Sequence, residues 1–268
     1  MTEAFKSQES VFNLLKNKEA IKKIEEKISY RYYSLIESDF FNKTQRKRSF
    51  FKIYLKGGQA IDTYWDTLFF PFNTKTTRVF AKKILNNKTI VLLGGGRSQL
   101  KKELQENDII PHEIVNVDPF VKDIEEGADP VIPISASDVN FIEKMQQQGI
   151  QSADEIWAVY SVPAYLKDPK EIHQLIQNID ELLAPGGSAR IWPIEVSGEG
   201  KEPELFARKN ALIESIKNIN EINKYEITLY ESAGRPGFIL YKLAPSEKEL
   251  QKEKDQEKIR KIRKELGL

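Results

Sequence analysis

The sequence predicts an α/β fold: a doubly wound, mostly parallel sheet that ends in an antiparallel hairpin and is preceded by a helical cap. Three observations lead to this prediction. An apolar run, Thr89–Leu93, ends in three glycines, strand-like and helix-like segments alternate after it, and only Glu231–Pro236 separates the last two strands. Alternating strands and helices form a parallel sheet covered on both faces. A link as short as Glu231–Pro236 is too short for a parallel crossover, so the last two strands should pair antiparallel.

The region before the sheet is expected to be largely helical. Apolar residues between Val11 and Ile36 recur mostly at steps of three and four, which places them on one face of an amphipathic helix. A basic run, Lys43–Arg48, and an aromatic-rich stretch, Phe50–Phe72, follow it, and the stretch is expected to form helices and turns of a cap. Such a basic run is more often a solvated face than a nucleic-acid site.

The remaining elements follow from apolar patterning and from turn residues. Strands are expected at Thr89–Leu93, Glu113–Val117, Val131–Ile134, Glu155–Tyr160, Ala189–Pro193, Tyr225–Tyr230 and Gly237–Leu243. Helices are expected at Gln99–Glu106, Phe141–Gln148, Pro169–Leu183 and Glu202–Ile219, and the third should stop at Pro185-Gly186-Gly187. Three parts are expected: a cap or lid (residues 1–86), an α/β domain (87–244) and a charged C-terminal helix (245–268).

Composition argues against several classes of function. The 41 Lys and Arg residues balance 40 Asp and Glu, so the overall charge does not favour nucleic acid or an anionic membrane. The absence of Cys, with only two His far apart, makes a metal site improbable. No apolar run approaches the ~20 residues of a membrane span, and the N-terminus lacks the pattern of a cleaved signal. We therefore expect a soluble, cytoplasmic protein, although secretion without a cleaved signal is compatible with the sequence.

The glycine turn Gly94–Gly96 follows a buried strand, where open α/β sheets bind nucleotide-like ligands. Glycines there let the backbone turn tightly and approach a ligand closely. Asp118 ends the next strand, where an acid can accept hydrogen bonds from a ribose diol, or it could be a turn or N-cap residue before Pro119. Asp138, with Ser137 beside it, follows the third strand and could cap the helix that begins near Asn140.

These landmarks occur in a characteristic order. Tyr160-Ser161-Val162-Pro163 ends the fourth strand, LLAPGG (182–187) precedes the fifth, and a hairpin closes the sheet. In this order the chain resembles the class I S-adenosylmethionine (SAM)-dependent methyltransferases over about residues 87–244, which would then form a Rossmann-like SAM-binding domain. The resemblance implies roles for eight residues: Gly94, Gly95 and Gly96 beside the methionyl part and ribose of SAM, Asp118 at the ribose hydroxyls, Ser137 and Asp138 at adenine, and Tyr160 and Ser161 facing the methyl group and acceptor.

Two positions depart from the first motif of that family. Leu92 stands where the family usually has an acid, and Ser98 where it has a third glycine. Loss of the acid is expected to affect SAM affinity more than the fold. If the acceptor has to lose a proton, Tyr165 and Glu195 are the candidate bases. The sequence does not identify the acceptor, a small molecule or a protein side chain, and leaves the oligomeric state open.

Two other functions are compatible with parts of the sequence. A non-catalytic SAM-binding or scaffold protein could keep the same fold, and the departures at Leu92 and Ser98 favour it. An NAD(P)-dependent oxidoreductase would fit the glycine turn and Asp118. It is disfavoured because Tyr165 is not followed by the lysine of a YxxxK pair.

Overall fold

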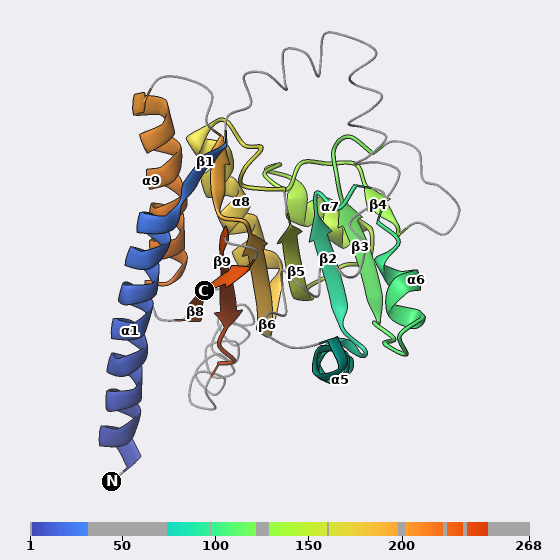
Figure 1. The fold of residues 1–268 in the computed structure, drawn as a ribbon, viewed down its shortest axis with the longest axis horizontal. Coiled ribbons are helices and arrows are strands. Elements are labelled where there is room, and N and C mark those ends of the chain that lie inside the picture. The colour runs from blue at the N-terminus through green and yellow to red at the C-terminus, as the bar shows by residue number, and fades with distance from the viewer. Residues whose placement is uncertain are drawn as a thin grey trace, which may run out of the picture.

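A seven-stranded sheet forms the centre of the molecule (Figure 1). The structure is a computed structural model and describes residues 2–31, 74–96, 98–121, 129–159, 161–197, 202–221, 224–232 and 235–245. The strands of the sheet are β2 (Thr89–Leu93), β3 (Glu113–Val117), β4 (Val131–Ile132), β5 (Ala153–Val159), β6 (Leu183–Trp192), β8 (Tyr225–Ser232) and β9 (Arg235–Lys242). Their order across the sheet is β4-β3-β2-β5-β6-β9-β8.

The chain winds outward from the middle of the sheet in two directions. From β2 it proceeds to β3 and β4 on one side, and it then returns to β5 and β6 on the other; all of these strands pair parallel. β9 is the exception, because it pairs antiparallel with both β6 and β8. The predicted fold class, a doubly wound and mostly parallel sheet with a terminal antiparallel hairpin, is therefore confirmed.

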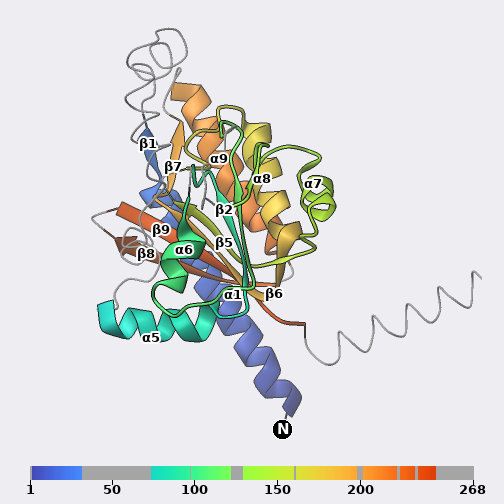
Figure 2. The same cartoon turned by 90° about the vertical axis from the view of Figure 1, so that its right-hand side faces the viewer.

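Helices cover both faces of this sheet (Figure 2). One face carries α7 (Phe141–Gln147), α8 (Pro169–Leu182) and α9 (Glu202–Ile219), and the other carries α5 (Thr74–Leu85) and α6 (Leu100–Gln105). Successive strand residues point to opposite faces, so Val91 and Leu92 belong to two different apolar clusters. The burial of both residues explains why the strand reads as an uninterrupted apolar run.

The end of α8 differs from the expected one. The helix begins with a capping box formed by Asp168 and Glu171, has Pro169 at its first position, and ends at Leu182. The glycine pair that was expected to stop it lies within β6. Ala153 pairs with Leu183 and Glu155 with Ser188, so the residues that include Pro185 fall at an irregularity in the ladder. Proline prevents a helix from continuing through this segment, but the chain had already turned into an extended conformation at Leu183.

The expected single helix over Val11–Ile36 is wrong at Ser29–Arg31, and residues 32–36 lie outside the described residues. α1 (Thr2–Lys27) ends at Lys27, and β1 (Ser29–Arg31) pairs parallel with β7 (Glu195–Ser197) in a separate two-stranded sheet. The local pattern gives no sign of this strand, because its hydrogen-bond partners lie far away in the sequence. The stretch Phe50–Phe72 and the C-terminal segment lie outside the described residues, so the helices expected there stay predictions.

α1 lies along the β8 side of the sheet and also packs on α9 (Figure 1). From Leu15 onward, the buried apolar side chains of this helix are Ala20, Ile21 and Ile24, which join the larger apolar cluster together with Ile28. Asn17, which is 1% exposed, donates from Nδ2 to the Tyr225 carbonyl at 2.6 Å. The Ile227 N–H donates to Asn17 Oδ1 at 3.0 Å, so one amide side chain satisfies two backbone groups of the edge strand.

Candidate functional site

The glycine loop Gly94–Gly96 follows the carboxyl end of β2, and the chain direction across the sheet reverses between β2 and the neighbouring β5. Ligands of open α/β sheets bind at this point, outside the carboxyl ends of the strands. Gly94 has φ +72°, and a Cβ built on it would lie 2.6 Å from Ser161 Cβ. The Ser161 hydroxyl in turn donates to the Leu93 carbonyl. The structure thus brings the predicted residues Gly94 and Ser161 into contact.

The three N–H groups of the loop are satisfied by residues at the end of β3. Gly94 donates to the Val117 carbonyl at 2.7 Å. Gly95 donates to Asn116 Oδ1 at 3.0 Å, and Gly96 donates to Asp118 Oδ2 at 3.1 Å. Asn116 Nδ2 also donates to the Gly96 carbonyl. The loop is therefore held from the side by β3, through an amide and a carboxylate.

Asp118 has a structural role in the loop and the following turn. It is 6% exposed, and its Oδ1 accepts the N–H of Phe120 at 2.9 Å. Burial raises the pKa of Asp118 above its ordinary value, against the opposing effect of hydrogen bonds from Phe120 and Gly96. This is the turn role considered for Asp118 from the sequence. Val121 donates a third backbone hydrogen bond to this carboxylate, which leaves about one of its four lone-pair positions for a further donor such as a hydroxyl.

Asp129 is a buried acid beside the loop that the sequence reasoning missed. It is 1% exposed and accepts the N–H of Leu100 at 2.8 Å on Oδ2 and that of Lys101 at 3.0 Å on Oδ1. Burial raises the pKa of Asp129 above its ordinary value. Ser98 Oγ also accepts the Leu100 N–H at 3.1 Å. The start of α6 is thus occupied by a carboxylate from the segment before β4.

The Ser137–Asp138 turn follows β4 and is fixed from three sides. Asp138 Oδ1 accepts the Asn140 N–H at 2.8 Å, and its Oδ2 accepts from Lys144 Nζ at 3.2 Å. The Asn140 hydrogen bond is the main reason why the pKa of Asp138 is lower than usual. Ser137 Oγ lies 2.8 Å from Ser135 Oγ. From α8, Asn178 Nδ2 donates to the Asp138 carbonyl at 3.0 Å. Asp138 therefore orders the turn before α7, but the cap considered from the sequence is not formed, because the N-cap residue of α7 is Asn140.

Two apolar side chains stand out of the surface next to these acids. Phe120, two residues after Asp118, is 53% exposed, and Val139, directly after Asp138, is 76% exposed. Asp118 is buried and Asp138 is half-buried, and exposed apolar side chains next to such acids could form the walls of a ligand site. In the sequence, the only feature that could have identified Phe120 and Val139 as site residues is their position just after Asp118 and Asp138.

Three predicted site residues, Tyr160, Tyr165 and Glu195, come at or after the end of β5. Tyr160 is outside the described residues. Tyr165 is half-buried in the turn after β5. Glu195, at the start of β7, is 7% exposed, and its Oε1 forms an ion pair with Arg235 Nη1 at 3.1 Å. The carboxylate of Glu195 thus already serves to bind β7 to the hairpin.

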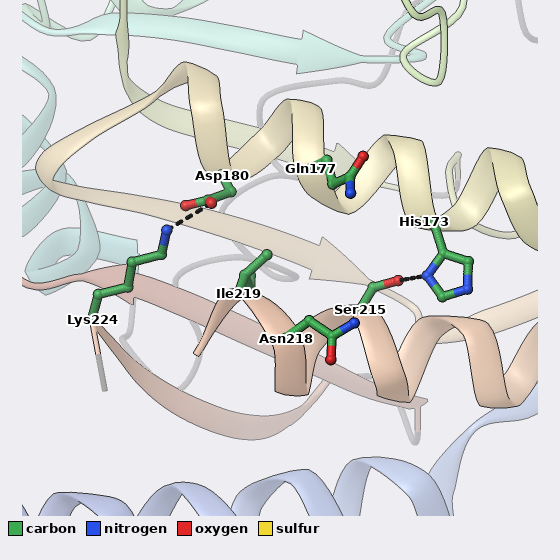
Figure 3. A pocket seen from close by; sticks show the side chains of 7 residues that line it. All are labelled: His173, Gln177, Asp180, Ser215, Asn218, Ile219 and Lys224. Atoms are coloured by element: carbon green, nitrogen blue, oxygen red, sulfur yellow. Dashed lines mark hydrogen bonds and ion pairs between the residues drawn. The ribbon is translucent and has the colours of Figure 1, made fainter. Parts of the chain in front are cut away.

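A separate pocket of about 240 Å³ lies between α8 and α9 (Figure 3). Its lining includes His173 and Ser215, joined by a 2.6 Å hydrogen bond, and Asp180, which pairs with Lys224 at 2.7 Å. The residues that line this pocket belong to α8 and α9, with Lys224, and none of them belongs to the glycine loop or to the ends of β3 and β5 beside it. Its charged groups neutralise each other, and it is not the candidate site.

Two further properties concern the described part of the chain. Within the described ranges, no three His, Asp or Glu side chains form a group that could hold a metal ion. None of the helices described here combines the length and apolar character that a membrane span requires.

No protein-family model matches the sequence, and neither does any curated protein. Solved structures with similar folds include an rRNA methylase from Streptococcus thermophilus, at 15% identity and TM-score 0.39, which covers 62% of this chain and 94% of its own. An O-methyltransferase family protein from Burkholderia thailandensis is 13% identical with TM-score 0.43, covering 78% of this chain and 63% of that one. The N-methyltransferase NodS from Bradyrhizobium japonicum is 14% identical with TM-score 0.37, covering 64% and 94%. Similarity this low does not establish an activity or a substrate.

Proposed function

We propose that this protein is a SAM-dependent methyltransferase that acts on a small-molecule or protein acceptor, with SAM bound at the glycine loop. The observation that carries the proposal is that backbone N–H groups of the site already donate hydrogen bonds to side chains of the protein. Those of Gly95 and Gly96 donate to Asn116 and Asp118, and the first N–H groups of α6 donate to Asp129.

A phosphate-binding loop has the opposite arrangement. It presents unpaired backbone N–H groups, often at a helix N-terminus, to the phosphate oxygens. Here the carboxylate of Asp129 takes that position, and its charge would repel a phosphate. This argues against NAD(P) and supports a nucleoside ligand without phosphate groups. SAM meets the requirement, because it carries adenosine and a positively charged sulfonium but no phosphate.

The surrounding side chains suit an adenosine group. We assign Asp118 to the ribose hydroxyls, since its carboxylate retains a free lone-pair position. Ser137 and Asp138 are assigned to the edge of the adenine base, and the exposed side chains of Phe120 and Val139 to its flat faces. Gly94–Gly96 would line the ribose and methionyl part, where any side chain would block a close approach.

SAM supplies an activated methyl group, so the protein has to position the acceptor and exclude water. Orientation alone supplies a large part of such catalysis, with effective molarities of ~10⁵ M or more. We assign Tyr160 and Ser161 to the region that faces the methyl group and acceptor. Tyr165 and Glu195 are the proposed bases for an acceptor that must lose a proton. Glu195 would have to share its carboxylate with Arg235 while doing so.

A non-catalytic SAM-binding or scaffold protein is the second candidate. Two observations favour it: Leu92, at the motif's acidic position, is fully buried, and the carboxylate of Glu195 is engaged in an ion pair. A protein of this kind would bind SAM and its demethylated product S-adenosylhomocysteine (SAH) without transferring the methyl group. A methyl-transfer assay on cell extracts, with radiolabelled SAM, separates the two candidates.

Isothermal titration calorimetry with SAM, SAH and NAD⁺ tests the proposed cofactor. We expect SAM and SAH to bind, and NAD⁺ not to bind at concentrations up to about 1 mM. A Kd of about 1 mM corresponds to a binding free energy of roughly −4 kcal/mol. Asp118→Asn removes one acceptor oxygen and should weaken SAH binding about tenfold. Asp180→Asn, in the separate pocket, is the matched control and should leave SAH binding unchanged. Folded protein that gives no heat with SAM or SAH would falsify the proposal.

A further inference from the structure

Asn116 is a polar residue within an apolar strand, and both ends of its amide are used. It is fully buried in β3, between Val115 and Val117. Its Oδ1 accepts the Gly95 N–H at 3.0 Å, and its Nδ2 donates to the Gly96 carbonyl. The side chain therefore binds both polar ends of the Gly95–Gly96 segment.

The glycine at position 95 is matched to this amide. A Cβ built on Gly95 would lie 2.8 Å from Asn116 Oδ1 and 3.2 Å from Leu92 Cβ. Gly95 is thus enclosed between the amide of β3 and an apolar side chain of β2. Leu92 offers no polar atom to the loop, so the side-chain hydrogen bonds of Gly95 come from β3.

We propose that Asn116 is a positioning residue of the cofactor site, which holds the Gly95–Gly96 segment in the conformation that binds SAM. This inference rests on the proposed function. Asn116 itself lies below the loop and touches its backbone, so it acts on the cofactor through the two glycines. Gly96 has φ +61°, a conformation from which a flexible loop would readily depart without such a constraint.

Only an amide side chain has the required chemistry at this position. It presents one donor and one acceptor a short distance apart, as needed for a carbonyl and an N–H of the same turn. A valine or leucine would fit the apolar strand but would leave the Gly95 N–H buried without a partner. An aspartate would still accept from Gly95 but could not donate to Gly96, and its charge would face the Gly96 carbonyl.

Asn17 provides a matched control for a purely structural effect. It is also buried, and it also uses both ends of its amide on backbone groups, Tyr225 O at 2.6 Å and Ile227 N at 3.0 Å. It lies between α1 and the β8 edge, at the other side of the sheet from β3. The same substitution at Asn17 and at Asn116 therefore removes the same kind of hydrogen bond, once at the β8 edge and once at the glycine loop.

The experiment measures SAH affinity and stability for Asn116→Asp and Asn17→Asp in the full chain. Both variants should be destabilised in urea unfolding. Asn116→Asp should weaken SAH binding about tenfold or more, whereas Asn17→Asp should change it less than about twofold. Amide exchange followed by NMR should be faster at Gly95 and Gly96 in Asn116→Asp only. If Asn116→Asp does not fold, Asn116→Ser, which adds no charge but cannot reach both groups, should show the same loss.

Equal SAH affinity in the wild type and in a folded Asn116 variant would overturn the inference while leaving the proposed function intact. An equal loss in Asn17→Asp would also overturn it, because the effect would then be one of general stability. A wild-type protein that binds no SAH overturns the proposed function together with the inference. In that case the exchange rates at Gly95 and Gly96 still decide whether Asn116 orders the loop.

Discussion

Gly94 is the residue at which backbone conformation and packing restrict the sequence most. Its φ of +72° is unfavourable for any residue with a Cβ, and that Cβ would overlap Ser161. Backbone strain and steric overlap can be measured separately, because the strain depends on Gly94 alone and the overlap also requires the side chain of Ser161. Gly149 shows the first effect without the second: its φ is +87°, and no atom lies within 4 Å of its Cβ position.

Gly94→Ala is expected to lower the free energy of unfolding by about 2 kcal/mol or more. Gly149→Ala should lower it by only about 1 kcal/mol, because it adds backbone strain alone. Ser161→Gly in the Gly94→Ala background should recover the difference between these two values. Urea unfolding of the wild type, Gly94→Ala, Ser161→Gly and the double variant measures the coupling between the two positions. Additive effects of the two substitutions would show that the side chains do not touch.

Single residues also show what the sequence alone can reveal about the site. Gly94–Gly96 and Asp118 are recognisable, because a glycine turn and an acid after consecutive strands form a local pattern. Asn116 is visible as a polar residue in an apolar strand, but its partners are not. Asp129 is invisible as a site residue, since it binds Leu100 and Lys101 across 29 and 28 residues of chain. Side-chain hydrogen bonds to distant backbone leave no periodic signal.

At the scale of secondary structure, the best-predicted elements are those with strong local patterns. β3 and α9 have the predicted bounds, since one is an apolar run between polar residues and the other an uninterrupted amphipathic segment. β1 was missed because its existence depends on β7, and the ladder irregularity at the start of β6 depends on β5. Pairing between distant strands, rather than propensity, decides these cases.

The start of α6 has a pH dependence that follows from the buried Asp129. Its pKa in the folded state is raised by burial, so the folded protein binds this proton more tightly than the unfolded chain. The contribution of Asp129 to the free energy of unfolding therefore increases as the pH falls through the raised pKa, and is complete below the ordinary value of about 3.9.

We expect the stability difference between the wild type and Asp129→Asn to widen as the pH is lowered from about 7 toward 4. Asparagine cannot take up the proton, so the variant lacks this increase. Urea unfolding at a series of pH values measures the difference at each point. A difference that stays constant over this range would show that the pKa of Asp129 is not raised.

At the scale of the whole molecule, α1 packs along one edge of the sheet, whereas the glycine loop follows a strand in its middle. α1 packs on α9 and β8, while the loop follows β2 and is held by the end of β3. The edge strand β8 would otherwise present unpaired backbone groups, and Asn17 satisfies two of them. Of the described parts of the predicted cap, α1 thus supports one sheet edge and α5 covers one face of the sheet, and the lid role stays a prediction.

Ile24→Ala should therefore lower stability without changing the proposed cofactor site. Ile24 is fully buried, and its truncation should cost about 2–5 kcal/mol in the free energy of unfolding. Leu15→Ala on the same helix is the control; Leu15 is 59% exposed, and its effect should be within about 0.5 kcal/mol. SAH affinity should be the same in both variants. Equal stability of the two would show that this face of α1 does not pack on the core.

The contacts of α1 also determine the order in which the chain acquires its structure during synthesis. The Asn17 hydrogen bonds span 208 and 210 residues, and β1 pairs with a strand that follows β6. A chain growing from its N-terminus exposes Ile21 and Ile24 long before the ribosome has made their partners, and distant contacts close slowly. α1 can therefore dock only after β8 and α9 have been translated, and its apolar face stays exposed until then.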